Sequence, residues 1–208
     1  MDRDIEGLIA LWQKRNICGV YCNTQQDARE KILEFIPSEA SIGFSGSVTL
    51  TQLGIIKQLE TRGHKIYDPY KPGLSRDESL KVRKSGAQAD YYLASPNAIS
   101  QKGELVFLSA YNNRIVGISS ASKVLIVSGI NKITADLETA IKRAREVAAP
   151  LNSKRLNWNS PCFKDGICHN EICNFPEYKR MCCQLLIIEA EIVPDRLTVV
   201  LVGEDLGY

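Results

Sequence analysis

The strongest constraint on the fold is the alternation of short apolar runs with amphipathic segments between residues 17 and 150. The run KVLIVS at 123–128 has the character of a buried strand, whereas the intervening segments carry apolar residues at helical spacing. Such alternation indicates an α/β fold with a mostly parallel sheet flanked by helices. Strands are expected at 17–22, 41–44, 64–67, 91–94 and 123–128, and helices at 24–36, 49–60, 75–85 and 136–148.

The two ends of the chain depart from this alternation. Apolar residues recur at helical spacing from residue 5 to residue 12 and predict an N-terminal helix within residues 1–16. Residues 151–183 are rich in Asn, Cys and Pro and show little periodicity. Two strands, 184–192 and 197–202, follow and are expected to be antiparallel end strands.

The size of the chain indicates one domain. A chain of 208 residues suits a single α/β domain that buries its own core, so residues 1–208 are expected to form one unit. Within it, residues 104–109 and 114–118 are expected to pair as a hairpin.

Composition argues against several classes of partner. The formal net charge is +2 and no dense basic tract is present, so nucleic-acid binding is not expected. No apolar run approaches the roughly 20 residues that a membrane span requires. The N-terminal stretch MDRDIEGLIALWQKR carries acidic residues and has no apolar centre of the kind a signal peptide needs. We therefore expect a cytoplasmic protein whose cysteines are mostly reduced thiols, metal ligands or redox groups.

Three loops that follow predicted strands share a small, polar character. They contain Ser45-Gly46-Ser47, Ser95-Pro96-Asn97 and Gly129-Ile130-Asn131-Lys132. In open α/β sheets ligands bind beyond the carboxyl ends of the strands, and backbone N–H groups at a helix start favour an anion. Glycine and serine after a strand also serve as plain turn and cap residues, so each loop alone is ambiguous.

Two charged residues are candidates for chemistry at this edge. Lys132 is the expected cationic partner of a phosphate or carboxylate, and the charge stabiliser if the protein is an enzyme. Glu104 is a candidate base or nucleophile if the loop 97–104 folds over the same edge. Neither a GxGxxG fingerprint nor a Walker A loop is present, which argues against classical nucleotide sites.

Several long motifs resemble the LUD domain, the lactate-utilisation-associated family, in its short stand-alone form. The resemblance extends from about residue 5 to the end of the chain. The matching segments are GFSGSVTLTQLG (43–54), YDPYKPGLSRDESL (67–80), SPNAISQKGELV (95–106), NNRIVG (112–117), SGINKITADLETAIKRAREVAAPLN (128–152) and VVLVGEDLGY (199–208).

The resemblance implies both a fold and a set of site residues. The family looks like the superfamily of glucosamine-phosphate deaminase, ribose-phosphate isomerase and CoA-transferases, whose strand-end loops hold phosphate-bearing or CoA ligands. The DPYKPG loop at 68–73 is expected to form one wall of the cleft. This chain has Ser45 where the family usually has glycine, and Ser-Pro-Asn at 95–97 replaces the commoner Ser-Ala/Gly-Asn. The positions that match the family motifs are Gly43, Gly46, Ser47, Ser95, Asn97, Glu104, Asn113, Arg114, Asn131 and Lys132.

The cysteines concentrate near the C-terminal end. Five of the seven lie between residues 162 and 183, and four of them, Cys162, Cys168, Cys173 and Cys182, are candidate metal ligands. Thiolate clusters favour zinc or an iron–sulfur cluster, although paired CxxC knuckles are absent and buried thiols or a redox pair would also explain them. Cys18 and Cys22 share one face of a predicted strand and are expected in the core.

Two functional hypotheses follow, with a third as a minor alternative. The first is a small-molecule-binding protein whose ligand is phosphate-bearing, carboxylate-bearing or CoA-like, with a place in organic-acid (lactate) metabolism implied by the resemblance. The second is a non-catalytic accessory subunit of an iron–sulfur redox complex, with an iron–sulfur oxidoreductase as partner and the cysteine-rich segment as docking surface. A ligand-sensing regulator is the third, and no helix-turn-helix segment supports direct DNA binding.

Overall fold

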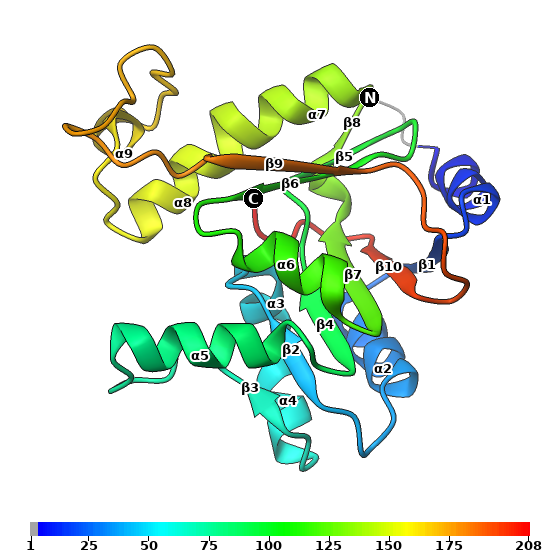
Figure 1. The fold of residues 1–208 in the computed structure, drawn as a ribbon. Helices are drawn as coiled ribbons and strands as arrows, with labels where there is room; N and C mark the ends of the chain where they lie inside the picture. Colours follow the sequence, from blue (N-terminus) through cyan, green and yellow to red (C-terminus); the bar gives the residue numbers. More distant parts are fainter. Residues whose placement is uncertain (1–3) are drawn as a thin grey trace.

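The computed structural model describes residues 4–208 and contains a six-stranded main sheet (Figure 1). Its strands are β1 (Cys18–Cys22), β2 (Ile42–Phe44), β3 (Ile66–Tyr67), β4 (Tyr91–Ala94), β7 (Lys123–Gly129) and β10 (Leu197–Val202). They lie in the order β1-β10-β7-β4-β2-β3, and every neighbouring pair is parallel. The predicted α/β fold with a mostly parallel sheet is confirmed.

Helices cover both faces of the main sheet. The first face buries Leu93, Leu125 and Val200 against α2, α3 and α4. The opposite face buries Tyr92 and Ile126 against α1 and α6. Helix α5 (Arg76–Gly86) packs beside β2 and β3. The other helices named here are α1 (Ile5–Lys14), α2 (Gln25–Phe35), α3 (Val48–Leu53), α4 (Ile55–Thr61) and α6 (Asn113–Ser120).

Local capping signals explain where two of these helices begin. Thr24 accepts from the Asp27 N–H, and the Asp27 carboxylate accepts from the Thr24 N–H, which forms a capping box at α2. Ser75 and Glu78 form the same arrangement at α5. Both helix starts were predicted from the sequence and are confirmed.

A second, four-stranded sheet lies over the face covered by α1 and α6. Its strands are β5 (Ala98–Ser100), β6 (Leu105–Ser109), β8 (Ile133–Thr134) and β9 (Gln184–Ile188), in the order β8-β5-β6-β9. Phe107 on β6 joins the core shared with the main sheet, whereas Val106 faces Ala140 and Ala144 of the helical layer above. That layer consists of α7 (Leu137–Arg143), the π-helical turn η2 (Ala144–Ala148) and α8 (Ala149–Arg155) (Figure 1).

Two predicted helix boundaries differ from the structure. The helix expected over 49–60 is split, because Gly54 adopts a left-handed conformation (φ 64°) that ends α3 before α4 begins. The helix expected to stop before Pro150 instead continues through it, and the π-helical turn η2 directly precedes α8. Proline is tolerated in the first turn of α8 because its missing N–H is not needed there.

The hairpin expected from residues 104–109 and 114–118 is wrong in its second half. Residues 114–118 belong to α6, whose buried Gly117 and Ile118 pack against the main sheet. Instead, β6 pairs antiparallel with β5, which directly precedes it, and on its other edge with β9, which comes from much later in the sequence. A short apolar run has no periodicity that separates helix from strand, so tertiary packing decided between them.

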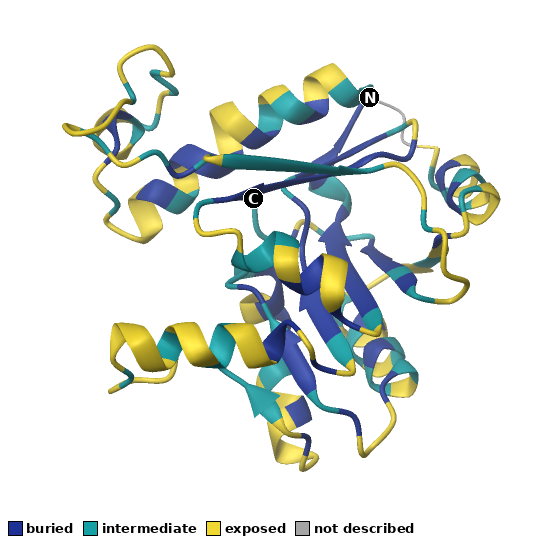
Figure 2. Cartoon of the chain, viewed as in Figure 1, coloured by how far each residue is buried: buried dark blue, intermediate teal, exposed yellow. Residues whose placement is uncertain are grey.

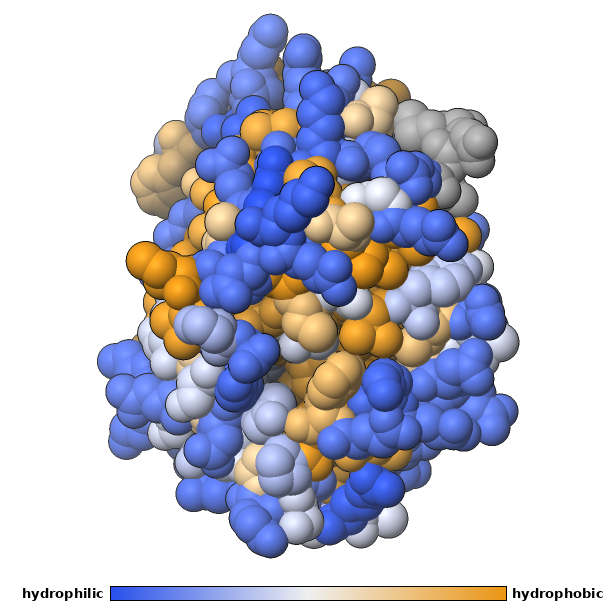
Figure 3. Space-filling view, turned by 90° about the vertical axis from the view of Figure 1, so that its right-hand side faces the viewer, coloured by the Kyte–Doolittle hydropathy of each residue, from blue (hydrophilic) through white to orange (hydrophobic). Residues whose placement is uncertain are grey.

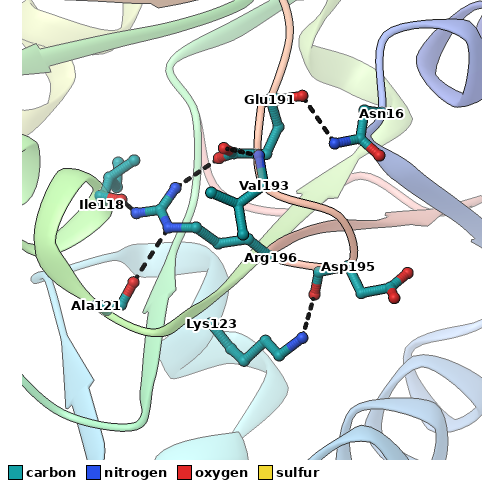
Figure 4. A network of polar contacts seen from close by, with 8 residues as sticks. All are labelled: Asn16, Ile118, Ala121, Lys123, Glu191, Val193, Asp195 and Arg196. Carbon is teal, nitrogen blue, oxygen red and sulfur yellow. Dashed lines mark hydrogen bonds and ion pairs between the residues drawn. The ribbon is translucent and has the colours of Figure 1, made fainter.

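The two last strands belong to different sheets, so they do not pair with each other. β9 is the expected antiparallel strand, at the edge of the second sheet, but β10 inserts in parallel between β1 and β7. The connection between them is tied down by Arg196, which donates to the Ala121 carbonyl (3.2 Å) and pairs with Glu191 (2.5 Å) (Figure 4). Lys123 donates to the carbonyl of Asp195 (2.8 Å), which anchors the same turn to β7.

Burial follows this layered architecture (Figure 2). The main strands are buried, whereas the outer faces of α5 and α7 and most of the cysteine-rich segment are exposed. Cys22 is buried as expected, but Cys18 is exposed, because β1 lies at the edge of the sheet. The predicted N-terminal helix is confirmed from Ile5, and residues 1–3 lie outside the described part of the chain.

The molecular surface is mixed in character. Figure 3 shows a face on which hydrophilic side chains surround smaller areas of apolar ones. Within residues 4–208, no helix combines the length and the apolar character needed to cross a membrane.

Candidate functional site

A cavity of about 930 Å³ opens at the carboxyl ends of strands β2 and β4. It is lined by the loops after β2, β4 and β6, by α8, and by Tyr208 near the end of the chain. This is the edge where open α/β sheets bind ligands, and the volume lies within the roughly 300–1,000 Å³ typical of small-molecule sites. The sequence-based expectation of a pocket at the strand-end loops is thus matched by a cavity in the structure.

Lys132 is the most distinctive charged group of the cavity. Its side chain is only 2% exposed, and Nζ donates to the hydroxyls of Thr49 and Ser95 (2.9 Å each) and to the Pro96 carbonyl (3.2 Å). All three partners are uncharged, and within residues 4–208 no carboxylate forms an ion pair with it. Burial, and then the nearby guanidinium groups of Arg143 and Arg114, lower the pKa of the Lys132 ammonium well below its ordinary range.

Arg114 connects two of the predicted loops. Its Nη1 donates to Asn97 Oδ1 (2.9 Å) and to the Leu108 carbonyl (3.1 Å), and its Nη2 donates to the Gly46 carbonyl (3.2 Å). Asn97 Oδ1 also accepts from the Leu108 N–H (2.7 Å). The guanidinium thus holds the Gly46 loop and the Asn97 loop at a fixed separation at the cavity wall.

The lining is rich in positive charge and contains unsatisfied hydroxyls. Its basic residues outnumber its acidic ones by five to two, counting Lys57, Arg83, Arg114, Lys132 and Arg155 against Glu60 and Asp68. The hydroxyls of Ser45 and Ser109 are buried and have no hydrogen-bond partner among the described residues. Buried polar atoms are normally paired, so these two hydroxyls are candidate hydrogen-bond partners for a ligand if their side chains turn towards the cavity.

The predicted wall from the DPYKPG loop is present. Tyr70 lines the cavity, and its hydroxyl accepts from the Gly46 N–H (2.6 Å). Arg83 on α5 lies over the Tyr70 ring, 4.9 Å from the centroid. Tyr70 therefore links the Gly46 loop to α5.

Most of the remaining predicted residues also line the cavity. Ser47 does so while it caps α3 by accepting from the Leu50 N–H (3.3 Å). Asn113 lines it beside Arg114. Of the ten residues that the family motifs suggested, Gly46, Ser47, Ser95, Asn97, Asn113, Arg114 and Lys132 meet at this one cavity.

Glu104 does not reach the cavity, which overturns the expectation that its loop folds over this edge. Residues 98–100 form β5, and the turn at Gly103 (φ 94°) carries Glu104 towards α1. There Trp12 donates to the Gly103 carbonyl (2.9 Å), and the Glu104 carboxylate accepts from the Ser100 hydroxyl. Glu104 therefore supports the β5–β6 turn and is not placed to act as a nucleophile in this cavity.

Gly43 and Asn131 do not line the cavity and instead support the packing around it. A Cβ at Gly43 would lie 1.9 Å from the Gly86 carbonyl oxygen, so the glycine allows α5 to approach β2 closely. The Asn131 side chain accepts from the Leu206 N–H and donates to the Gly207 carbonyl (3.1 Å each). It thereby holds the segment that brings Tyr208 to the cavity.

Sequence reasoning missed the residues that the C-terminal third contributes. Arg155 donates to the Tyr208 hydroxyl (2.9 Å), and both line the cavity with Trp158 and Met181. Trp158 packs edge-on against Tyr111, with ring centroids 5.7 Å apart. No local pattern marks these residues, because they come from α8, from the segment after it and from residue 208, which meet only in the folded structure.

The four candidate metal ligands converge on a separate, much smaller cavity of about 20 Å³. It is lined by Cys162, Cys168, Cys173 and Cys182 together with two arginines, Arg145 and Arg180. Burial raises the pKa of the Cys168, Cys173 and Cys182 thiols. Across residues 4–208, no group of three or more His, Cys, Asp or Glu side chains is already arranged to hold a metal ion.

The fold and the larger cavity define an α/β protein with a basic, partly aromatic cavity at the carboxyl edge of a parallel sheet. Comparison with known families is more specific. The chain belongs to the LUD domain family, whose model matches residues 5–202. The resemblance seen in the sequence motifs is therefore confirmed.

A solved structure of low sequence identity supports the fold. The chain is similar to a DUF162 family protein from Deinococcus radiodurans at 14% identity, with a TM-score of 0.55 and coverage of 98% of this chain and 99% of that one. It also aligns with ribose 5-phosphate isomerase from Plasmodium falciparum at 21% identity and a TM-score of 0.34, over 53% of this chain and 52% of that one. No curated protein matches the chain.

Proposed function

We propose that this protein binds a small ligand with a phosphate or carboxylate group in the 930 Å³ cavity, with Lys132 and Arg114 beside the anion. The observation that carries the proposal is the buried Lys132, whose hydrogen-bond partners among the described residues are all uncharged oxygens. A buried ammonium without a counter-ion is costly, and an anionic ligand would supply the missing charge.

The surroundings of Lys132 support the same conclusion. Arg114 lines the cavity and lies close enough to lower the Lys132 pKa, so the local field is positive. The free hydroxyls of Ser45 and Ser109 can add neutral hydrogen bonds to anionic oxygens. Together they form a set of cations and hydroxyls suited to a phosphate or carboxylate.

The size of the cavity indicates that the anion is part of a larger molecule. Inorganic phosphate would fill only a small part of the volume, and the remaining lining includes the rings of Tyr70, Tyr111 and Trp158. Aromatic walls of this kind favour an organic moiety with apolar or planar surface. A phosphate ester, an organic acid such as lactate, and a CoA-like molecule each supply the anionic group, but they differ in how much apolar or planar surface they add.

A binding assay with three probes tests this proposal. Sulfate, lactate and coenzyme A would be titrated into the protein by isothermal titration calorimetry, and each variant would be checked for folding by circular dichroism. We expect saturable binding of at least one probe that is weakened by Arg114→Met and unchanged by Glu104→Gln, which alters a carboxylate outside the cavity. If no probe binds and the protein instead co-purifies with an iron–sulfur partner, the alternative of a non-catalytic redox subunit replaces this proposal.

Binding should be coupled to proton uptake by Lys132. The pKa of this amine is depressed in the free protein, and an anion beside it would raise that pKa. Above the free-state pKa, binding then takes up a proton, so affinity should fall as the pH rises and approach its limiting value at lower pH. Calorimetry with sulfate in buffers of different ionisation enthalpy measures the uptake; a pH-independent affinity without proton uptake would contradict it.

A further inference from the structure

The segment after α8 is ordered without a core of its own. Its only helix is the short α9 (Pro161–Asp165), and none of residues 162–180 is fully buried. Three large apolar side chains, Ile167, Ile172 and Phe175, are more than half exposed. A segment with so little apolar burial needs another source of cohesion, and in small domains this is commonly a disulfide or a bound metal.

Four thiols lie where such a source is needed. Cys162, Cys168, Cys173 and Cys182 line one cavity. Cys162 lies in α9, Cys168 and Cys173 lie in the loop after it, and Cys182 lies just before β9. All four are free thiols in the structure. Four cysteines around one small space are the ligand set of structural zinc sites and of iron–sulfur centres.

The small volume of the cavity favours a single ion. About 20 Å³ is enough for one ion, whereas a cluster of several iron and sulfur atoms would require the loops to move apart. Four thiolates around a divalent metal carry a net charge of about −2, which nearby cations would offset. The guanidinium groups of Arg145 and Arg180 line the same cavity, and Arg180 Nε is buried without a partner among the described residues.

We propose that Cys162, Cys168, Cys173 and Cys182 bind one zinc ion that clasps residues 162–182 together beside the start of α8. The thiols surround the cavity but are not yet arranged to hold a metal, so binding draws the loops inward. No residue from 162 to 180 is buried, so this movement would disturb little apolar packing. The clasp would also steady one wall of the larger cavity, because Ala149 and Met181 line both cavities.

Elemental analysis of the full chain, purified anaerobically, tests the proposal. We expect about one zinc per chain, as in a closed four-thiolate site, and less than a tenth of that in Cys168→Ser and Cys173→Ser. The matched controls are Cys18→Ser and Cys183→Ser, which change exposed thiols that do not line the cavity and should keep the zinc.

A second measurement covers the case in which the serine variants fail to fold. Chelation of the wild-type chain, followed by titration with Co²⁺, should produce the absorption spectrum of a tetrahedral thiolate site with a one-to-one end point. Chelation should also make residues 162–182 the first site of proteolysis, while zinc restores protection. The proposal is overturned if the chain takes up neither zinc nor cobalt, if it contains an iron–sulfur chromophore, or if the four cysteines form disulfides in place of binding metal.

The zinc proposal stands apart from the anion-binding proposal. The metal readouts do not involve a ligand in the larger cavity, and Lys132 and Arg114 do not line the thiol cavity. Either proposal can therefore fail while the other holds.

Discussion

Replacing Lys132 with methionine should weaken binding of an anionic probe by roughly 100-fold, the loss expected when a charged hydrogen bond of about 3 kcal/mol is removed. Methionine has a similar length and stays apolar, so the change removes the ammonium without leaving a large void. Isothermal titration calorimetry with sulfate or with whichever probe binds the wild-type chain measures the effect.

The same variant should not be less stable in the absence of ligand. In the free protein, Lys132 is buried without an ion pair, so its desolvation cost offsets the three hydrogen bonds that it donates to uncharged partners. We expect the melting temperature of Lys132→Met to equal or exceed that of the wild type. A large loss of both stability and binding would instead identify Lys132 as a structural residue, and unchanged binding would remove it from the site.

Gly43→Ala should destabilise the fold by about 3 kcal/mol, at the upper end of the cost of overpacking. The added Cβ would lie 1.9 Å from the Gly86 carbonyl oxygen, which is a backbone atom of α5. Neither side can yield easily, because β2 is held between β3 and β4 by parallel pairing on both edges. Urea denaturation followed by circular dichroism measures the free energy of unfolding.

The matched control lies across the same contact. A Cβ at Gly86 would meet Tyr67 Cβ at 3.1 Å and Gly43 Cα at 3.5 Å, so Gly86→Ala requires only a small adjustment. It should cost less than Gly43→Ala, and both variants should retain probe affinity once folded, because neither glycine lines the cavity. A Gly43→Ala chain of normal stability that failed to bind would restore the ligand-contact role that the sequence motif suggested.

The parts of the fold that depend on local chemistry could be predicted from the sequence. Thr24 caps Asp27 and Ser75 caps Glu78 within one helical turn, and both pairs stand at helix starts that were expected from the sequence. The strand-end position of Lys132 could also be predicted, because alternating strands and helices form a parallel sheet whose strand-end loops share one edge. These features depend on residues that are close in sequence or on a rule that holds for the whole fold class.

The assignments that went wrong depended on contacts between distant segments. The sequence showed that 197–202 is a strand, but only its fit between β1 and β7 made it a central parallel strand. Likewise, Glu104 was placed at the cavity because its turn could have folded either way, and the hydrogen bond from Trp12 to Gly103 directs it to α1.

The amino-acid sequence by itself determined the α/β class, most of the strands and helices, and the charged and hydroxyl groups available at the strand ends. Tertiary structure alone decided which of these groups share a cavity, which glycine serves packing, and that four irregularly spaced cysteines face one small space. The physical reason is that periodicity and capping are local, with energies set within a few residues. Burial of Lys132, the close approach of Gly43 to Gly86 and the gathering of thiols arise only when distant segments pack together.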